Sequence, residues 1–96
     1  GQVPLDPATG DMVKGGITEQ TTQVLKNLKA VLTHIDRDFS HVVSSTIYLT
    51  DLGNFQEVNK LYEQALAGIK PARATVQVCA LPKGALVEIS MIACVG

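Results

Sequence analysis

The chain has 96 residues, of which 46% are hydrophobic and only 4% aromatic, and its formal net charge is -1. This length argues for one domain, residues 1–96, with a core built from aliphatic side chains. Eight basic residues without a basic run argue against a nonspecific nucleic-acid binder, and no apolar stretch reaches the roughly 18 residues that a membrane span needs.

Residues 2–13 predict a short hairpin that opens the fold. Residues 2–5 are expected to be extended, and residues 11–13 could return as a second strand. Between them Pro7 fixes φ, while Asp6 and Gly10 suit the corners of a turn.

Residues 18–35 predict an amphipathic helix. Thr18 is the expected N-cap, with Glu19 in the first turn. Apolar residues recur at helical spacing along one face, with two more beside them: Val24, Leu28, Val31 and Ile35, widened by Leu25 and Leu32.

Residues 42–50 are rich in β-branched side chains and predict a strand. Alternation would place Val43, Ile47 and Leu49 on one side, with Ser45 interrupting the row. The other side would carry Val42, Ser44, Thr46 and Tyr48. A face that is half apolar and half polar fits a subunit contact or a pocket wall better than open solvent.

The second half of the chain predicts a helix over residues 55–66 and two strands. Asp51 or Asn54 is expected to cap the helix, and Gly68 to follow its end. The strands are expected over residues 74–79 and 86–95, joined by a turn at residues 81–84. Strict alternation places one set of last-strand residues against the core: Val87, Ile89, Met91, Ala93 and Val95. The element order predicts an α+β or α/β two-layer sandwich, with both helices on one face of a mixed sheet.

Few residues offer metal or redox chemistry. Cys79 and Cys94 lie in separate apolar runs without C-x-x-C spacing, so we expect two buried free thiols in a reducing compartment. His34 and His41 have no second ligand at metal spacing, so we expect surface or capping histidines. No nucleotide, metalloprotease or serine-hydrolase motif occurs, so a site here should need no cofactor and no metal.

Arg73 and Glu88 are the two charged residues in unusual places. Arg73 begins an apolar strand, where its planar fork could bind a carboxylate. It could instead reach the surface or pair with a structural glutamate. Glu88 interrupts the most hydrophobic strand and could activate a water near such an arginine. Its alternatives are an exposed face or an ion pair with Arg73.

The C-terminal third carries three short motifs. They are Lys70-Pro71-Ala72-Arg73-Ala74-Thr75-Val76, then Ala80-Leu81-Pro82-Lys83-Gly84, then Val87-Glu88-Ile89 with Ile92-Ala93. Earlier segments agree in order, including Gly1-Gln2-Val3-Pro4 and Val58-Asn59-x-x-Tyr62. Together they resemble the reactive intermediate deaminase family, also called YjgF, liver perchloric-acid-soluble protein or endoribonuclease, over the whole chain.

The resemblance implies a chorismate-mutase-like α+β subunit that forms a homotrimeric barrel, with clefts between neighbouring subunits. It implies cofactor-independent hydrolysis of 2-aminoacrylate, 2-iminobutanoate and related small imino or enamino acids to 2-oxo acids and ammonia. The expected location is the cytoplasm or the mitochondrial matrix, with no membrane partner and no nucleic acid.

Carried onto this chain, the resemblance implies that Arg73 binds the substrate carboxylate and that Glu88 positions or activates the attacking water. Thr75 takes a pocket position where relatives often have cysteine. Asn59, Gly1 and Pro82 would line the cleft.

The chain departs from the family at its N-terminus. Relatives carry a further hairpin there, with a pocket tyrosine and a serine just ahead of the position of Gly1. We therefore expect an N-terminally incomplete domain. Without that hairpin, a non-catalytic trimer that binds small carboxylates or a protein is the alternative. A ribonuclease role is disfavoured by the near-neutral charge.

Overall fold

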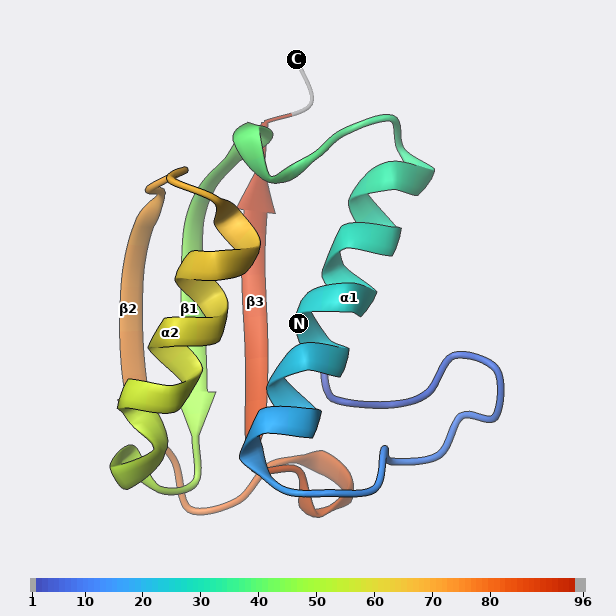
Figure 1. Cartoon of the computed structure of the whole chain (residues 1–96), viewed down its shortest axis with the longest axis vertical. Coiled ribbons are helices and arrows are strands. Elements are labelled where there is room, and N and C mark those ends of the chain that lie inside the picture. The colour runs from blue at the N-terminus through green and yellow to red at the C-terminus, as the bar shows by residue number, and fades with distance from the viewer. Residues whose placement is uncertain (1, 95–96) are drawn as a thin grey trace.

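The computed structural model describes residues 2–94, which fold into one layer of helices on one layer of sheet (Figure 1). The helices are α1 (Ile17–His34) and α2 (Phe55–Leu66). The strands are β1 (Val42–Leu49), β2 (Ala72–Gln77) and β3 (Val87–Ala93), in the order β2-β1-β3. β1 pairs parallel with β2 and antiparallel with β3. The predicted mixed sheet with two helices on one face is therefore confirmed.

The core lies between the sheet and the helices. Side chains from every layer are less than 2% exposed: Ile47, Leu49, Val87 and Ile89 from the sheet, Val24 from α1, and Val58 and Leu66 from α2. These are aliphatic residues, as the composition predicts. In the part of the chain that the structure describes, no helix is both long and apolar enough to cross a membrane.

Helix α1 begins one residue earlier than predicted, and its N-cap is Gly16 rather than Thr18. The Glu19 side chain accepts a hydrogen bond from the Gly16 N–H at 2.8 Å, which satisfies a backbone donor that the helix itself cannot. The Thr18 hydroxyl instead donates to Glu57 of α2 at 3.1 Å.

Near the C-terminal end of α1, two apolar residues that were predicted to lie on the buried stripe are exposed. Val31 is 49% exposed and Ile35 48% exposed. The buried stripe turns toward Leu25, Leu28 and Leu32, so Val31 lies on its flank, and Ile35 lies past the last helical residue.

A register shift in β1 overturns part of its predicted alternation. The pairing with β3 is irregular between Val42 and Ser44, which is the effect of a β-bulge. Val42 therefore faces the core at 5% exposure, and Val43 is 54% exposed. After the bulge the alternation is regular, and Ser45, Ile47 and Leu49 are buried as one row.

The N-terminal segment does not form the two predicted strands. It makes only isolated bridges, between Gln2 and Ile89 of β3 and between Leu5 and Met12. The predicted turn is present: the Ala8 N–H donates to the Asp6 carboxylate at 2.9 Å, and Gly10 has a φ of 75°. The side chain of Asn27 on α1 holds this segment by donating to the Leu5 carbonyl at 2.8 Å.

The side of the sheet opposite the helices is named here the open face. Strand register places these residues on it: Ser44, Thr46 and Tyr48, then Ala72, Ala74 and Val76, then Glu88, Ser90 and Ile92. Val76 is 41% exposed and Ile92 65% exposed. No element within residues 2–94 covers this face.

Both cysteine side chains are exposed, which corrects the prediction that they are buried. The reason is that both strands end earlier than predicted. Cys79 follows the end of β2, and Cys94 follows the end of β3. Val95, also predicted to face the core, lies outside the described residues.

Thr21 leads to a stability prediction. Its side chain is 0% exposed, and its hydroxyl has no hydrogen-bond partner among the described residues. A buried unsatisfied hydroxyl costs about 1–3 kcal/mol. We therefore expect Thr21→Val, which replaces the hydroxyl by a methyl group, to raise the free energy of unfolding by about 1 kcal/mol, measured by urea denaturation. The exposed Thr22→Val is the matched control and should change little; a destabilised Thr21→Val would show that the hydroxyl is satisfied in solution.

Candidate functional site

Arg73 lies on β2 directly beside Ser45 of β1, which places its side chain on the helix-covered side of the sheet. Three residues of α2 surround its guanidinium. Its Nη1 donates to the side-chain oxygen of Asn59. Its central carbon lies 5.2 Å from the ring centroid of Tyr62 and 5.9 Å from that of Phe55, within cation–π range. The residues that hold this arginine are therefore neutral.

No carboxylate of residues 2–94 lies within salt-bridge distance of Arg73. Within residues 2–94, the only contact within salt-bridge distance is between His41 and Asp38, far along the chain from Arg73, and it is an ion pair only when the histidine is protonated. The alternative of a structural ion pair with Glu88 is therefore not seen in this chain. A guanidinium has five N–H donors, and Asn59 accepts from one of its nitrogens. The exposed guanidinium is thus oriented and still able to bind an anion.

A buried hydrogen bond fixes the ring beneath Arg73. The Tyr62 hydroxyl donates to Oγ of Ser45 at 2.9 Å, and the two residues are 4% and 3% exposed. Tyr62 is a core residue of α2, and its ring also supports the guanidinium. The helical spacing of the sequence carries no signal for this second role, because it depends on the register between β2 and β1.

This hydrogen bond can be tested by a single substitution. Tyr62→Phe keeps the ring and leaves the buried Ser45 hydroxyl without its donor, so we expect a loss of about 1–2 kcal/mol in the free energy of unfolding. Chemical denaturation of Tyr62→Phe, of Ser45→Ala and of the double variant measures the energy of interaction between the two hydroxyls. Fully additive effects would show that the two hydroxyls do not interact.

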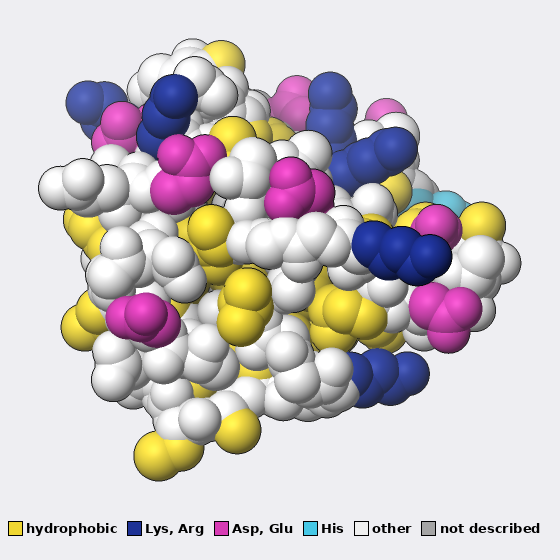
Figure 2. Space-filling view, turned by 60° about the horizontal axis from the view of Figure 1, so that its bottom comes forward, with side chains coloured by type: hydrophobic (Ala, Val, Ile, Leu, Met, Phe, Trp, Pro, Cys, Tyr) yellow, Lys and Arg dark blue, Asp and Glu magenta, His cyan; other side chains and the backbone are white. Residues whose placement is uncertain are grey.

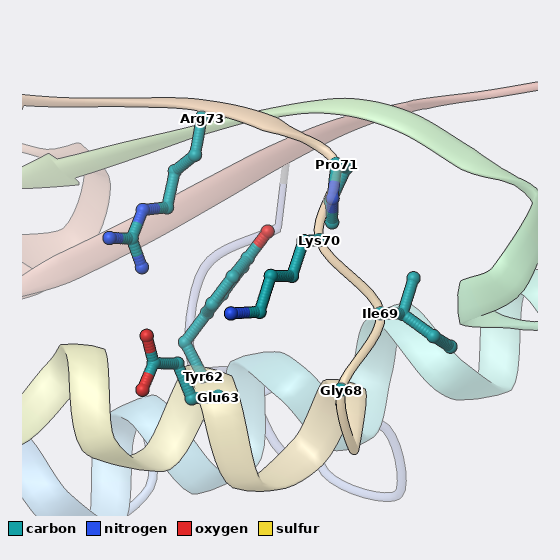
Figure 3. A pocket seen from close by; sticks show the side chains of 7 residues that line it. All are labelled: Tyr62, Glu63, Gly68, Ile69, Lys70, Pro71 and Arg73. Atoms are coloured by element: carbon teal, nitrogen blue, oxygen red, sulfur yellow. The ribbon is translucent and has the colours of Figure 1, made fainter.

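A pocket of about 460 Å³ opens beside Arg73, between α2 and the segment that leads into β2 (Figure 3). Its lining residues are Tyr62, Glu63, Gly68, Ile69, Lys70, Pro71 and Arg73. The chain turns here because α2 ends at Ala67 in the left-handed region, with Gly68 at a φ of 93° and Pro71 three residues later. This volume falls within the usual range of small-molecule sites, about 300–1,000 Å³.

Glu88 is not brought to Arg73 within one chain. It pairs with Tyr48 and belongs to the open face, while Arg73 belongs to the helix-covered face, and β1 lies between their strands. Thr75 lies two residues beyond Arg73 on the same face, half-buried beside Ile47. One chain therefore places Arg73, Asn59 and Thr75 on one side of the sheet and Glu88 on the other.

Pro82, another predicted cleft residue, lies away from Arg73 in this chain. Pro82 is exposed in a short helical turn, Pro82–Gly84, near the end of the sheet opposite the start of β2 (Figure 1). Gly1 lies outside the described residues. A role for Pro82 beside Arg73 would therefore require a second copy of the chain.

His41 has the capping role that the sequence predicts. Its Nδ1 accepts from the Asp38 N–H at 3.2 Å and lies 3.1 Å from the Asp38 carboxylate. Hydrogen bonds from the hydroxyl and the backbone N–H of Ser40 lower the pKa of Asp38 from its ordinary value. Within the described part of the chain, no three His, Cys, Asp or Glu side chains come together as metal ligands.

Comparison with known proteins gives a consistent result. The family model described as endoribonuclease L-PSP matches residues 1–95. The chain is 58% identical to protein DfrA of Myxococcus xanthus over 93 residues, which cover 97% of this chain and 71% of that protein. It is 47% identical over 96 residues to the mouse 2-iminobutanoate/2-iminopropanoate deaminase, covering all of this chain and 71% of the relative.

Solved structures agree with these relatives. YyfA, a Rid-family protein of Yersinia pestis, superposes with a TM-score of 0.93 at 49% identity, over 96% of this chain and 74% of that one. TdcF of E. coli, solved with bound serine, gives a TM-score of 0.89 at 32% identity over the same shares. The chain thus spans somewhat over two thirds of the length of these proteins.

Proposed function

Because the chain belongs to the family described as endoribonuclease L-PSP, we propose that it hydrolyses reactive 2-imino and 2-enamino acids to 2-oxo acids and ammonia. Its substrates would include 2-iminobutanoate and 2-aminoacrylate. The observation that carries this proposal is Arg73, a guanidinium held by an amide and two aromatic rings and paired with no carboxylate within the described chain. The mouse relative named for this activity supports the reaction class.

Arg73 would bind the substrate carboxylate through its planar fork. Two parallel N–H donors match the two carboxylate oxygens and fix the orientation of the attached C=N group. Asn59 and Tyr62 would reduce the cost of ordering the arginine, because they already restrain it before substrate arrives. Thr75, two residues further on, would line the same side.

Glu88 would activate the water. In this step its carboxylate accepts a proton as the water oxygen bonds to the imine carbon, and the nitrogen gains protons as the C–N bond breaks and ammonia leaves. An enamine would first take a proton at carbon to become the imine. The reaction needs no oxidant, reductant or metal.

A homotrimer would bring the two groups together. Arg73 and Glu88 lie on opposite faces of one sheet, so one substrate can contact both only if they come from different copies. The open face, on which Val76 and Ile92 are exposed, offers a surface for that contact. A cyclic assembly repeats the same contact and closes it.

The test is turnover by the purified chain. 2-Iminobutanoate is generated in situ, and the release of 2-oxobutanoate and ammonia is compared with the spontaneous rate. Acceleration by the assembled protein is the expected result. A correctly assembled protein that gives no acceleration would contradict the proposal.

A non-catalytic binding protein is the second candidate. The separation of Glu88 from Arg73 favours it, because one chain alone presents a carboxylate-binding arginine without the activating group. A non-catalytic binding protein would bind a 2-oxo acid but would not accelerate hydrolysis of the imino acid. A ribonuclease role gains no comparable support: on the face seen in Figure 2, basic side chains are interspersed with acidic ones and form no continuous stripe.

A further inference from the structure

The wall of the pocket beside Arg73 carries a second cation. Lys70 lies in the segment between α2 and β2, and its side chain extends over Tyr62 into the pocket (Figure 3). Glu63, on the last part of α2, lines the same pocket. We propose that this pocket selects 2-imino acids that carry a second carboxylate, with Lys70 as the specificity-determining residue. The inference rests on the proposed function, because it assigns the substrate class of the same site.

The charges of the pocket match those of such a substrate. Arg73 and Lys70 are two positive groups, and among the described residues neither has a carboxylate within salt-bridge distance. A monocarboxylate would satisfy Arg73 and leave Lys70 without a counter-ion. A dicarboxylate of four or five carbons would satisfy both. The protonated C=N group between the two carboxylates is positive, and Glu63 supplies the negative charge that suits it.

The dimensions of the pocket also allow this ligand. Arg73 and Lys70 are three residues apart, so their Cα atoms are separated by at most about 10 Å. Both side chains are long and point into the same volume of about 460 Å³. Lysine is a compact point charge on a flexible stem, so it can follow distal carboxylates at different distances from the fixed guanidinium.

The pocket would also favour release of the product. Hydrolysis converts the positive iminium into a neutral carbonyl. The attraction to Glu63 is lost at that moment, while both carboxylates keep their cations. The dicarboxylic 2-oxo acid should therefore bind, but more weakly than the imine from which it forms.

The test compares two substrates, 2-iminoglutarate and 2-iminobutanoate. Each is made in situ from the corresponding amino acid by a flavin oxidase. We expect Lys70→Ala to lower kcat/KM for 2-iminoglutarate about tenfold, as the loss of one charge-assisted contact implies, and to change that for 2-iminobutanoate less than about twofold. Lys70→Arg should retain the preference. Lys60→Ala removes the same charge from an exposed position of α2 outside the pocket and should affect neither substrate.

The outcomes separate the two proposals. Equal effects of Lys70→Ala on both substrates, or none on 2-iminoglutarate, would overturn the role of Lys70 while turnover itself supports the deaminase. If hydrolysis of neither substrate is accelerated, the deaminase proposal fails. Calorimetry with 2-oxoglutarate and 2-oxobutanoate then still tests whether the pocket selects dicarboxylates. Tighter binding of 2-oxoglutarate that is lost in Lys70→Ala supports the dicarboxylate site; equal binding of the two oxo acids contradicts it.

Discussion

Arg73→Ala should lower kcat/KM for a 2-imino acid by about 10²- to 10⁴-fold and leave the fold intact. A hydrogen bond to a charged group contributes about 1.5–3 kcal/mol, and a bidentate carboxylate contact makes two of them. The guanidinium is exposed and has no carboxylate partner among the described residues, so its removal breaks no ion pair. The loss should therefore appear mainly in turnover and binding, while the free energy of unfolding falls by only about 1–2 kcal/mol, because the hydrogen bond to Asn59 and the two ring contacts are lost.

The matched variant is Arg73→Lys. It keeps the positive charge but loses the planar fork. A compact ammonium cannot stack on the rings of Tyr62 and Phe55 as a planar guanidinium does. We expect it to recover only a small part of the activity. Full activity in Arg73→Lys would show that the charge alone matters, and full activity in Arg73→Ala would remove the carboxylate contact from the mechanism.

The sequence predicts the layers of this fold because each element has a clear hydrophobic period. Val58 and Tyr62 are buried on α2 as their spacing predicts, and Val87 and Ile89 are buried on β3. These positions depend only on local geometry, which fixes which residues share a face. The same reasoning predicts that both helices cover one side of the sheet.

The errors arise where a neighbouring element decides the local structure. The bulge after Val42 is defined by the pairing of β1 with β3, and no property of the strand sequence alone exposes it. The N-cap of α1 depends on Glu19 reaching back to the backbone of Gly16, which leaves Thr18 free to contact Glu57. The bulge therefore depends on a contact that is distant in sequence, whereas the cap depends on a side chain only three residues away that replaces the expected Thr18 cap.

The site is predictable only in part. The position of Arg73 at the start of a strand is visible in the sequence, as is the oddity of Glu88 among apolar neighbours. Alternation within the last strand already predicts that Glu88 faces away from the core. The face of Arg73 depends on the register between β2 and β1, so the separation of the two residues could not be predicted from the sequence. The ring of Tyr62 beneath Arg73 depends on the same register.

That separation makes assembly a condition for catalysis in the proposed mechanism, and Ile92→Lys tests it. Ile92 is the most exposed of the large apolar side chains on the open face, at 65%. Burying an isoleucine stabilises a contact by about 1.5–3 kcal/mol, and a buried unpaired lysine opposes it. Because a symmetric trimer repeats the change in each subunit, we expect Ile92→Lys to sediment or scatter light as a single chain at micromolar concentration and to lose deaminase activity.

Val31→Lys provides the control for this experiment. Val31 is also an exposed apolar residue, at 49%, but it lies on α1, on the other side of the sheet. This variant should keep the mass and the activity of the parent protein. If Ile92→Lys also keeps both, the open face is not the subunit contact. If it becomes a single chain and keeps its activity, Arg73 and Glu88 need not come from different copies, and the water must be activated by a group on the same side of the sheet as Arg73.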